Sequence, residues 1–113
     1  MSERLPARVE ATAIIRRVQS EGGFATMVRR GDPDRGAITL LVAERGQITA
    51  VIERQMAADF TYRWREISAA GPSGAPDWRE WLDRKAQSDP DSWVIELDVA
   101  DAQRFIAETT ASG

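Results

Sequence analysis

Residues 6–21 carry apolar side chains at every third or fourth position, the spacing that places them on one side of a helix. Arginines and glutamates fall mainly on the other sides. Pro6 is tolerated in the first turn of a helix, and Gly22 and Gly23 can end it in a left-handed conformation. The apolar stripe consists of Ala7, Ala11, Ile14, Ile15 and Val18. The pattern therefore predicts an amphipathic helix over this segment.

After residue 23 the apolar period changes to two, which is typical of strands. The predicted strands span residues 24–29, 37–43, 47–54 and 60–67. In the last of these, Phe60, Tyr62 and Trp64 alternate with arginines, as in a half-buried antiparallel strand. We therefore expect the aromatic rings to face the core, with Arg63 and Arg65 on the outer face.

The sequence around Gly46 also predicts the register of a hairpin. A two-residue loop, Arg45 and Gly46, would leave apolar residues of the second strand on the wrong face. A three-residue loop over residues 44–46 keeps them together and puts Gly46 at the left-handed position of a type I turn with a G1 bulge. In that register Ile38, Leu40 and Val42 face Ile52, Ala50 and Ile48. We predict the three-residue loop.

The second half of the chain predicts a loop, a helix, a strand and a C-terminal segment. Glycines and prolines make residues 68–75 a flexible loop. Pro76 opens a helix and Pro90 ends it. Its apolar stripe contains Trp78, Trp81, Leu82 and Lys85. Alternation over residues 93–98 indicates a fifth strand, and residues 99–113 form an acidic C-terminal extension with a weak helical stripe.

A chain of 113 residues, 42% of them hydrophobic, has the size and apolar content of one domain with one core. The predicted order of elements is α-β-β-β-β-α-β-α. This order indicates an α+β fold over residues 1–113, an antiparallel β-meander with helices packed mainly on one face.

The composition excludes most familiar catalytic sites. With no histidine and no cysteine, the chain cannot form a Ser-His-Asp or Cys-His nucleophile, a zinc site of the usual kind, or a disulfide. Residues 1–6 lack the apolar run of a signal peptide, and no apolar run is long enough to cross a membrane. We expect a cytoplasmic protein that does not bind membranes and needs no cofactor.

Two segments resemble a known family. They are the run from Ile14 to Ile38, with Arg29-Arg30-Gly31-Asp32-Pro33-Asp34-Arg35-Gly36 at its centre, and the run Asp89-Pro90-Asp91-Ser92-Trp93-Val94-Ile95-Glu96. With them the chain resembles a family of small bacterial proteins classified as a domain of unknown function. The resemblance implies a bacterial cytoplasmic protein of this size. It implies no reaction, and no catalytic residue is transferred from it.

The segment from Arg29 to Gly36 is the richest in candidate chemistry. Arginines beside glycines can bind a phosphate bidentately while the backbone approaches it closely. The candidate anion-binding residues are Arg29, Arg30, Gly31, Arg35 and Gly36. The alternative is a hairpin loop in which arginines and aspartates neutralise one another, and it is favoured because the segment matches neither the P-loop nor the dinucleotide pattern.

The tripeptide Asp-Pro-Asp occurs twice, each time before a predicted strand. If those strands run parallel, the two loops lie at one edge of the sheet and four carboxylates could converge on Mg²⁺, Mn²⁺ or Ca²⁺. The four candidate ligands are Asp32, Asp34, Asp89 and Asp91. The alternative is a pair of ordinary turns, in which proline fixes φ and aspartate caps a backbone N–H.

The remaining candidates concern partners. The tryptophans lie on the predicted inward stripes, which favours core packing; Trp78 and Trp81 are the ones expected to be partly exposed, so they are candidate contacts for a protein partner. Arg63 and Arg65 could form a basic patch for RNA or DNA, but a pI near 5.0 argues against nucleic acid. We predict a protein-binding or assembly module that forms a homodimer or binds a partner through a sheet edge or the tryptophan helix. The alternatives are a metal-dependent hydrolase or phosphoryl-transfer enzyme, and a nucleic-acid-binding accessory protein.

Overall fold

The structure, a computed structural model, describes residues 5–56, 58–67 and 77–111. The predicted flexible loop, residues 68–75, lies outside the described residues. The elements are α1 (Ala7–Ser20), β1 (Phe24–Arg29), β2 (Ile38–Glu44), β3 (Gln47–Met56), β4 (Tyr62–Ile67), α2 (Trp78–Ser88), β5 (Trp93–Asp98) and α3 (Ala102–Ala111). This confirms the α+β class and the predicted order of elements. Among the described residues, no helix has the length and hydrophobicity needed to cross a membrane.

The five strands form one sheet in the order β1-β5-β2-β3-β4. The sheet is mixed, because β2 and β5 run parallel while every other neighbouring pair is antiparallel. The prediction of a purely antiparallel meander is therefore wrong. The reason lies in β5, whose residues Trp93 to Ile95 are all buried, so this strand needs an interior position with both faces covered. The chain reaches that position by crossing over the sheet through α2.

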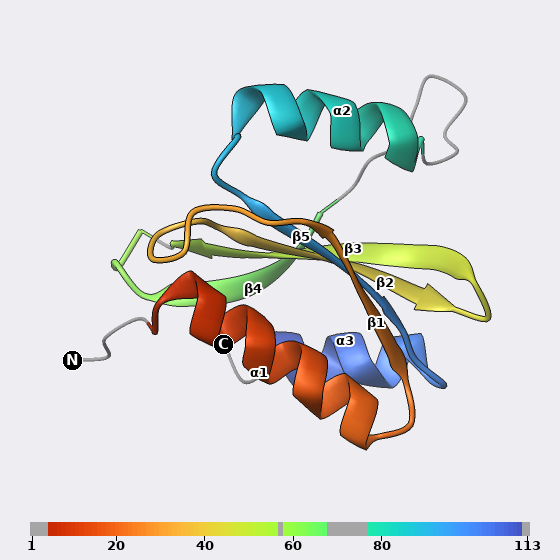
Figure 1. Cartoon of the computed structure of the whole chain (residues 1–113). Coiled ribbons are helices and arrows are strands. Elements are labelled where there is room, and N and C mark those ends of the chain that lie inside the picture. The colour runs from red at the N-terminus through yellow and green to blue at the C-terminus, as the bar shows by residue number, and fades with distance from the viewer. Residues whose placement is uncertain (1–4, 57, 68–76, 112–113) are drawn as a thin grey trace.

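The helices cover both faces of the sheet (Figure 1). Helices α1 and α3 lie on one face, and α2 lies on the other, so two of the three helices share a face. The main core lies between the sheet and the α1/α3 pair and contains Ala7, Ala11, Val18, Ile38, Leu40, Val42, Ile52, Trp93, Ile95, Leu97, Ala102 and Phe105. A smaller cluster beneath α2 contains Leu41, Val51 and Val94. Residues of α2 pack against this second cluster.

The β2–β3 hairpin has a two-residue turn, so the predicted three-residue loop is wrong. Glu44 pairs with Gln47, and Arg45 and Gly46 between them have φ values of 53° and 80°. Positive φ at both positions matches the twist of the flanking strands. A bulge at Thr49 shifts the pairing, so that Leu40 faces Ile52 and Val42 faces Ala50, in place of the predicted partners Ala50 and Ile48.

Strand β4 begins two residues later than predicted, and this changes the role of Phe60. Phe60 has a φ of 65° and is 82% exposed, so its predicted place in the core is wrong. The turn before the strand is stabilised by Asp59, whose carboxylate accepts hydrogen bonds from the backbone and side chain of Thr61. These bonds lower the pKa of Asp59. Trp64 packs against the main core as predicted.

Candidate functional site

The two Asp-Pro-Asp loops lie side by side, as the hypothesis of parallel strands required. Strands β2 and β5, which follow them, pair in parallel from Ile38 with Trp93 onward. The backbone N–H of Asp32 donates to the carbonyl of Asp91 at 2.9 Å, and the indole N–H of Trp93 donates to the carbonyl of Asp32 at 2.7 Å. The Arg29 guanidinium also donates to the carbonyl of Pro90 at 2.6 Å. The contact between the loops is thus made mainly by backbone groups.

The four carboxylates of these loops do not gather around a common point. The Asp32 carboxylate accepts hydrogen bonds from the backbone N–H groups of Arg35 and Asp34, which lower its pKa. The Asp89 carboxylate instead lies 3.7 Å from the ammonium group of Lys85 on α2. Within the described ranges, no group of three or more carboxylates is placed to hold a metal ion. Asp32 therefore behaves as the turn alternative predicts, by capping backbone N–H groups, whereas the Asp89 carboxylate lies beside Lys85.

Gly31 and Gly36 serve the contact between the two loops. A Cβ atom at either position would collide with the backbone carbonyl of Asp91. Glycine is needed here because the second loop approaches the first too closely for any side chain. The candidate anion-binding residues are thereby separated: Arg29 is tied to the loop contact, whereas Arg30 is exposed and reaches a different surface.

That surface is a shallow hollow of about 830 Å³ over the outward side of α1. Among the described residues, four arginines line it and no acidic residue does: Arg8, Arg16 and Arg17 from the helix, and Arg30 from the segment after β1. Of these, Arg8, Arg16 and Arg30 take part in none of the ion pairs between described residues. The sequence alone did not suggest this cluster, because Arg8 and Arg16 looked like the ordinary solvent side of a helix.

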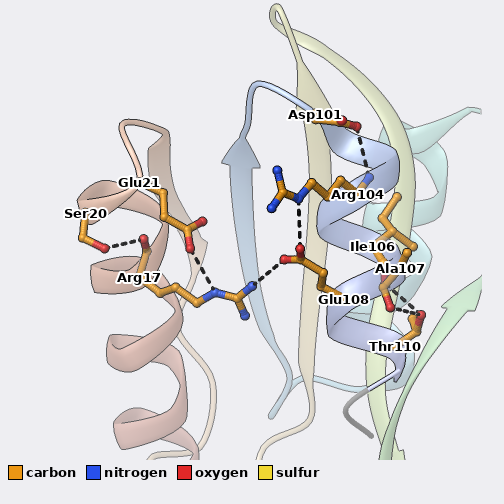
Figure 2. Close-up of polar contacts among 9 residues, drawn as sticks. All are labelled: Arg17, Ser20, Glu21, Asp101, Arg104, Ile106, Ala107, Glu108 and Thr110. Carbon is orange, nitrogen blue, oxygen red and sulfur yellow. Dashed lines mark hydrogen bonds and ion pairs between the residues drawn. The ribbon is translucent and has the colours of Figure 1, made fainter.

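Arg17 differs from the other three because it joins α1 to α3 (Figure 2). Its guanidinium lies 3.6 Å from the Glu21 carboxylate and 3.7 Å from that of Glu108, which also accepts a hydrogen bond from Arg104 at 3.0 Å. The cleft between the two helices, about 400 Å³ in volume, thus carries both signs of charge. These ion pairs join the two helices, and their charges balance. The arginines that form no ion pair with a described residue, Arg8, Arg16 and Arg30, line the hollow on the outer side of α1.

The two edges of the sheet differ in character. Strand β1 is one edge, and it exposes Phe24 (76%) and Val28 (49%). Strand β4 is the other edge, and it exposes Arg63, Arg65 and Glu66. Charged side chains on an edge strand discourage another strand from pairing with it, whereas an apolar edge invites pairing. The β1 edge is therefore the open one.

The tryptophans of α2 are half-buried against the sheet. Trp78 and Trp81 pack on the cluster beneath α2, with their ring centroids 6.3 Å apart in an edge-to-face arrangement. This packing covers much of the surface of the two tryptophan side chains. A role in partner binding stays a prediction for them.

A buried ion pair under α2 was missed by the sequence reasoning. The ammonium group of Lys85 lies 2.7 Å from the Glu53 carboxylate, which also accepts a hydrogen bond from the Thr39 hydroxyl at 2.9 Å. Burial raises the pKa of Glu53, but the hydrogen bonds from Lys85, Gln55 and Thr39 outweigh it and lower the pKa below its ordinary value. The available signal was the position of Lys85, the only lysine, on the apolar stripe of its helix.

The proposed basic patch for nucleic acid is not continuous. Arg63 and Arg65 are both exposed on β4, and Arg63 pairs with Asp59 at 3.2 Å. Arg54, which could have extended the patch, lies instead over the Trp64 ring and pairs with Glu10 of α1 at 2.6 Å, on the opposite face of the sheet. Arg63 and Arg65 therefore lack this neighbour.

Comparisons with known proteins place the chain among proteins without an assigned function. A family model described as a protein of unknown function, DUF1491, matches residues 5–107, which includes part of the predicted C-terminal extension. No curated protein matches the chain.

Three solved structures are similar. The crystal structure of a DUF1491 family protein from Caulobacter crescentus CB15 has 29% sequence identity and a TM-score of 0.74, over 90% of this chain and 94% of that chain. The NMR structure of a DUF1491 family protein from the same organism also has 29% identity and a TM-score of 0.74, over 92% and 94%. The solution structure of protein Atu0922 from A. tumefaciens, at 24% identity, has a TM-score of 0.69 over 88% and 89% and shows the same fold.

Proposed function

Since this chain belongs to the DUF1491 family of proteins of unknown function, we propose that it is a protein-binding module whose docking site is the open edge of β1. The occupant is an extended segment of a partner protein, which adds to the sheet as a further strand next to β1. We place this docking in the cytoplasm, as the resemblance to small bacterial proteins implies.

The observation that carries the proposal is the contrast between the two sheet edges. Strand β1 pairs with β5 on one side, and no described strand pairs with it on the other. From Phe24 to Val28 the strand contains no charged residue, and the apolar side chains of Phe24 and Val28 are exposed. An edge of this kind offers backbone hydrogen bonds for affinity and apolar side chains for specificity.

A partner segment fits this edge better than a second copy of the chain. Pairing the β1 strands of two copies about a two-fold axis would bring their two α1 helices to the same interface. Each helix carries Arg8 and Arg16, which have no acidic partner in the described structure. The like charges of the two copies would then repel each other.

The test uses a neutral strand-forming probe, the peptide Thr-Val-Thr-Val-Thr-Val-Thr with acetylated and amidated ends. Titration of the ¹⁵N-labelled protein is expected to shift the amide resonances of Phe24 to Arg29. Phe24→Ser is expected to weaken binding at least about fivefold, since it removes roughly 40 Å² of apolar contact at about 25 cal/mol per Å².

Phe60→Ser is the matched control, because Phe60 is equally apolar and 82% exposed but lies outside β1. It is expected to bind the probe as the wild type does. Shifts confined to α2 would move the docking site to Trp78 and Trp81, and no shift in β1 would overturn the proposal. A probe-free dimer that Phe24→Ser converts to a monomer would identify the occupant as a second copy.

A further inference from the structure

We infer that the segment docked on β1 alternates acidic and apolar residues, with its acidic side chains facing Arg8 of α1 and Arg30, which follows β1. The inference rests on the proposed function of β1 as the docking edge, and it adds the chemistry of the partner. Three features carry it: the position of the arginines, their lack of partners, and the alternation of side chains along a strand.

Two of the three arginines, Arg8 and Arg30, lie beside the open edge. Helix α1 packs against β1. Glu10 points toward β3, where it pairs with Arg54, so at 100° per residue Arg8 lies on the opposite flank of the helix, the flank next to the β1 edge. Arg30 directly follows β1 and lines the same hollow. Arg16 lies on the outer side of the helix, away from the sheet.

These arginines lack an anion. In the described parts of the chain, the hollow that Arg8, Arg16 and Arg30 line has no acidic residue in its wall, and none of the three forms an ion pair. Neighbouring guanidinium groups repel one another, and a carboxylate between them removes that repulsion. Guanidinium groups also bind carboxylates through two parallel hydrogen bonds. The hollow is therefore complementary to acidic side chains.

The alternation of a strand connects this hollow to the apolar edge residues. Ala25 and Met27 of β1 pack against the main core on the α1 side, so Phe24 lies exposed on the α2 side. Val28, which is also exposed, lies at a bulge between Met27 and Arg29. An added strand places successive side chains on the two sides in turn. Its residues on the α2 side meet Phe24, and those on the α1 side face Arg8 and Arg30. A strand of RNA laid on the arginines would leave Phe24 without contacts, which favours a peptide.

The experiment compares three capped heptapeptides that differ only in their odd positions: Glu/Val, Lys/Val and the neutral Thr/Val probe. The Glu/Val peptide is expected to bind at least about tenfold more tightly than the Lys/Val peptide, the size expected for a few exposed ion pairs acting together. This ratio is expected to shrink between about 50 mM and about 300 mM salt, because salt screens exposed charges.

Charge reversal supplies the variant and its control. Arg8→Glu/Arg30→Glu is expected to reverse the preference in favour of the Lys/Val peptide. Arg79→Glu/Arg84→Glu makes the same change in charge at two exposed residues of α2, on the other face of the sheet, and is expected to keep the preference of the wild type. Circular dichroism melting curves check that both double variants fold.

The outcomes separate this inference from the proposed function. Equal binding of all three peptides to β1 would overturn the acidic partner and leave strand docking intact. Absence of binding by all three would overturn strand docking itself. A 16-nucleotide single-stranded RNA that binds more tightly than the Glu/Val peptide, and whose binding is lost in Arg8→Glu/Arg30→Glu, would assign the arginines to nucleic acid and overturn the inference.

Discussion

The two faces of the sheet are covered to different extents. Under α1 and α3, apolar residues from two helices and several strands form one continuous core, which includes Phe105 of α3 and Trp93 of β5. Under α2 the buried apolar cluster is small, and no residue of α2 is itself buried. Over β1 the α2 side is left open, with Phe24 exposed. The α1/α3 face therefore supplies most of the stability, and the α2 face leaves exposed surface that is available for binding.

The two faces of the sheet each hold ion pairs of a similar kind. On the α1/α3 side, the Arg17–Glu108 pair lies at the rim, where both side chains are about half exposed, whereas the Arg54–Glu10 pair lies further in, with side chains 19% and 14% exposed. On the α2 side, the Glu53–Lys85 pair lies beneath the helix, where the side chains are 9% and 16% exposed. A rim pair contributes little, whereas an inner pair strongly affects stability when one partner is removed. Among the described residues, each face therefore holds an inner ion pair, and the one beneath α2 accompanies the smaller apolar cluster.

The largest expected effect comes from two neighbouring leucines that face opposite ways. Leu40 lies in the main core and Leu41 in the cluster under α2, and both are almost completely buried. We expect Leu40→Ala to lower the free energy of unfolding by about 4 kcal/mol and Leu41→Ala by about 2.5 kcal/mol, because α2 can settle into the smaller cavity. Urea denaturation measures both. A larger loss for Leu41→Ala would contradict the comparison of the faces.

The next effect is expected from Glu53→Gln. The variant leaves the ammonium group of Lys85 without its charged partner, so we expect a loss of about 2 kcal/mol at pH 7, reduced by the partial exposure of Lys85. Glu66→Gln is the control, because Glu66 is an exposed acid on β4, and it is expected to change stability by less than about 0.5 kcal/mol.

The pH dependence of the same variant tests the cause. The pKa of Glu53 is lower in the folded chain than its ordinary value, so its carboxylate stabilises the fold above the unfolded pKa. This contribution is expected to disappear as the pH falls below about 4.3, the ordinary value for glutamate. The wild type should therefore lose stability more steeply than Glu53→Gln over that range. Parallel curves for the two proteins would show that Glu53 is not the group responsible.

Local patterns in the sequence predicted the elements and their inward faces. The apolar stripe from Ala7 to Val18 became α1, and the expected helix over residues 6–21 differs from it by one residue at each end. For the two Asp-Pro-Asp loops the sequence supplied only a condition: they meet if the strands that follow them run parallel. The structure meets that condition, against the predicted antiparallel meander.

Features that depend on long-range choices could not be predicted in this way. The insertion of β5 between β1 and β2 depends on which strand is buried on both faces in the finished sheet. Glu53 and Lys85 meet only because α2 folds over β3, and neither neighbourhood in the sequence signals the other. The cluster of Arg8, Arg16 and Arg30 arises in the same way, from a helix and a loop that become neighbours in the fold. These are the features on which the candidate site depends.

The smallest expected effect on stability is that of Phe24→Ser. Phe24 is 76% exposed, so its replacement removes little buried surface, and we expect a change below about 0.5 kcal/mol in the free energy of unfolding. Met27→Ser is the control on the other face of β1, where it removes a side chain packed against the main core; we expect a loss of about 1.5 kcal/mol. Urea denaturation of both variants, beside peptide titration, separates folding from binding. A loss above about 1 kcal/mol for Phe24→Ser would mean that Phe24 supports the fold, and that the α2 side is closed over β1 after all.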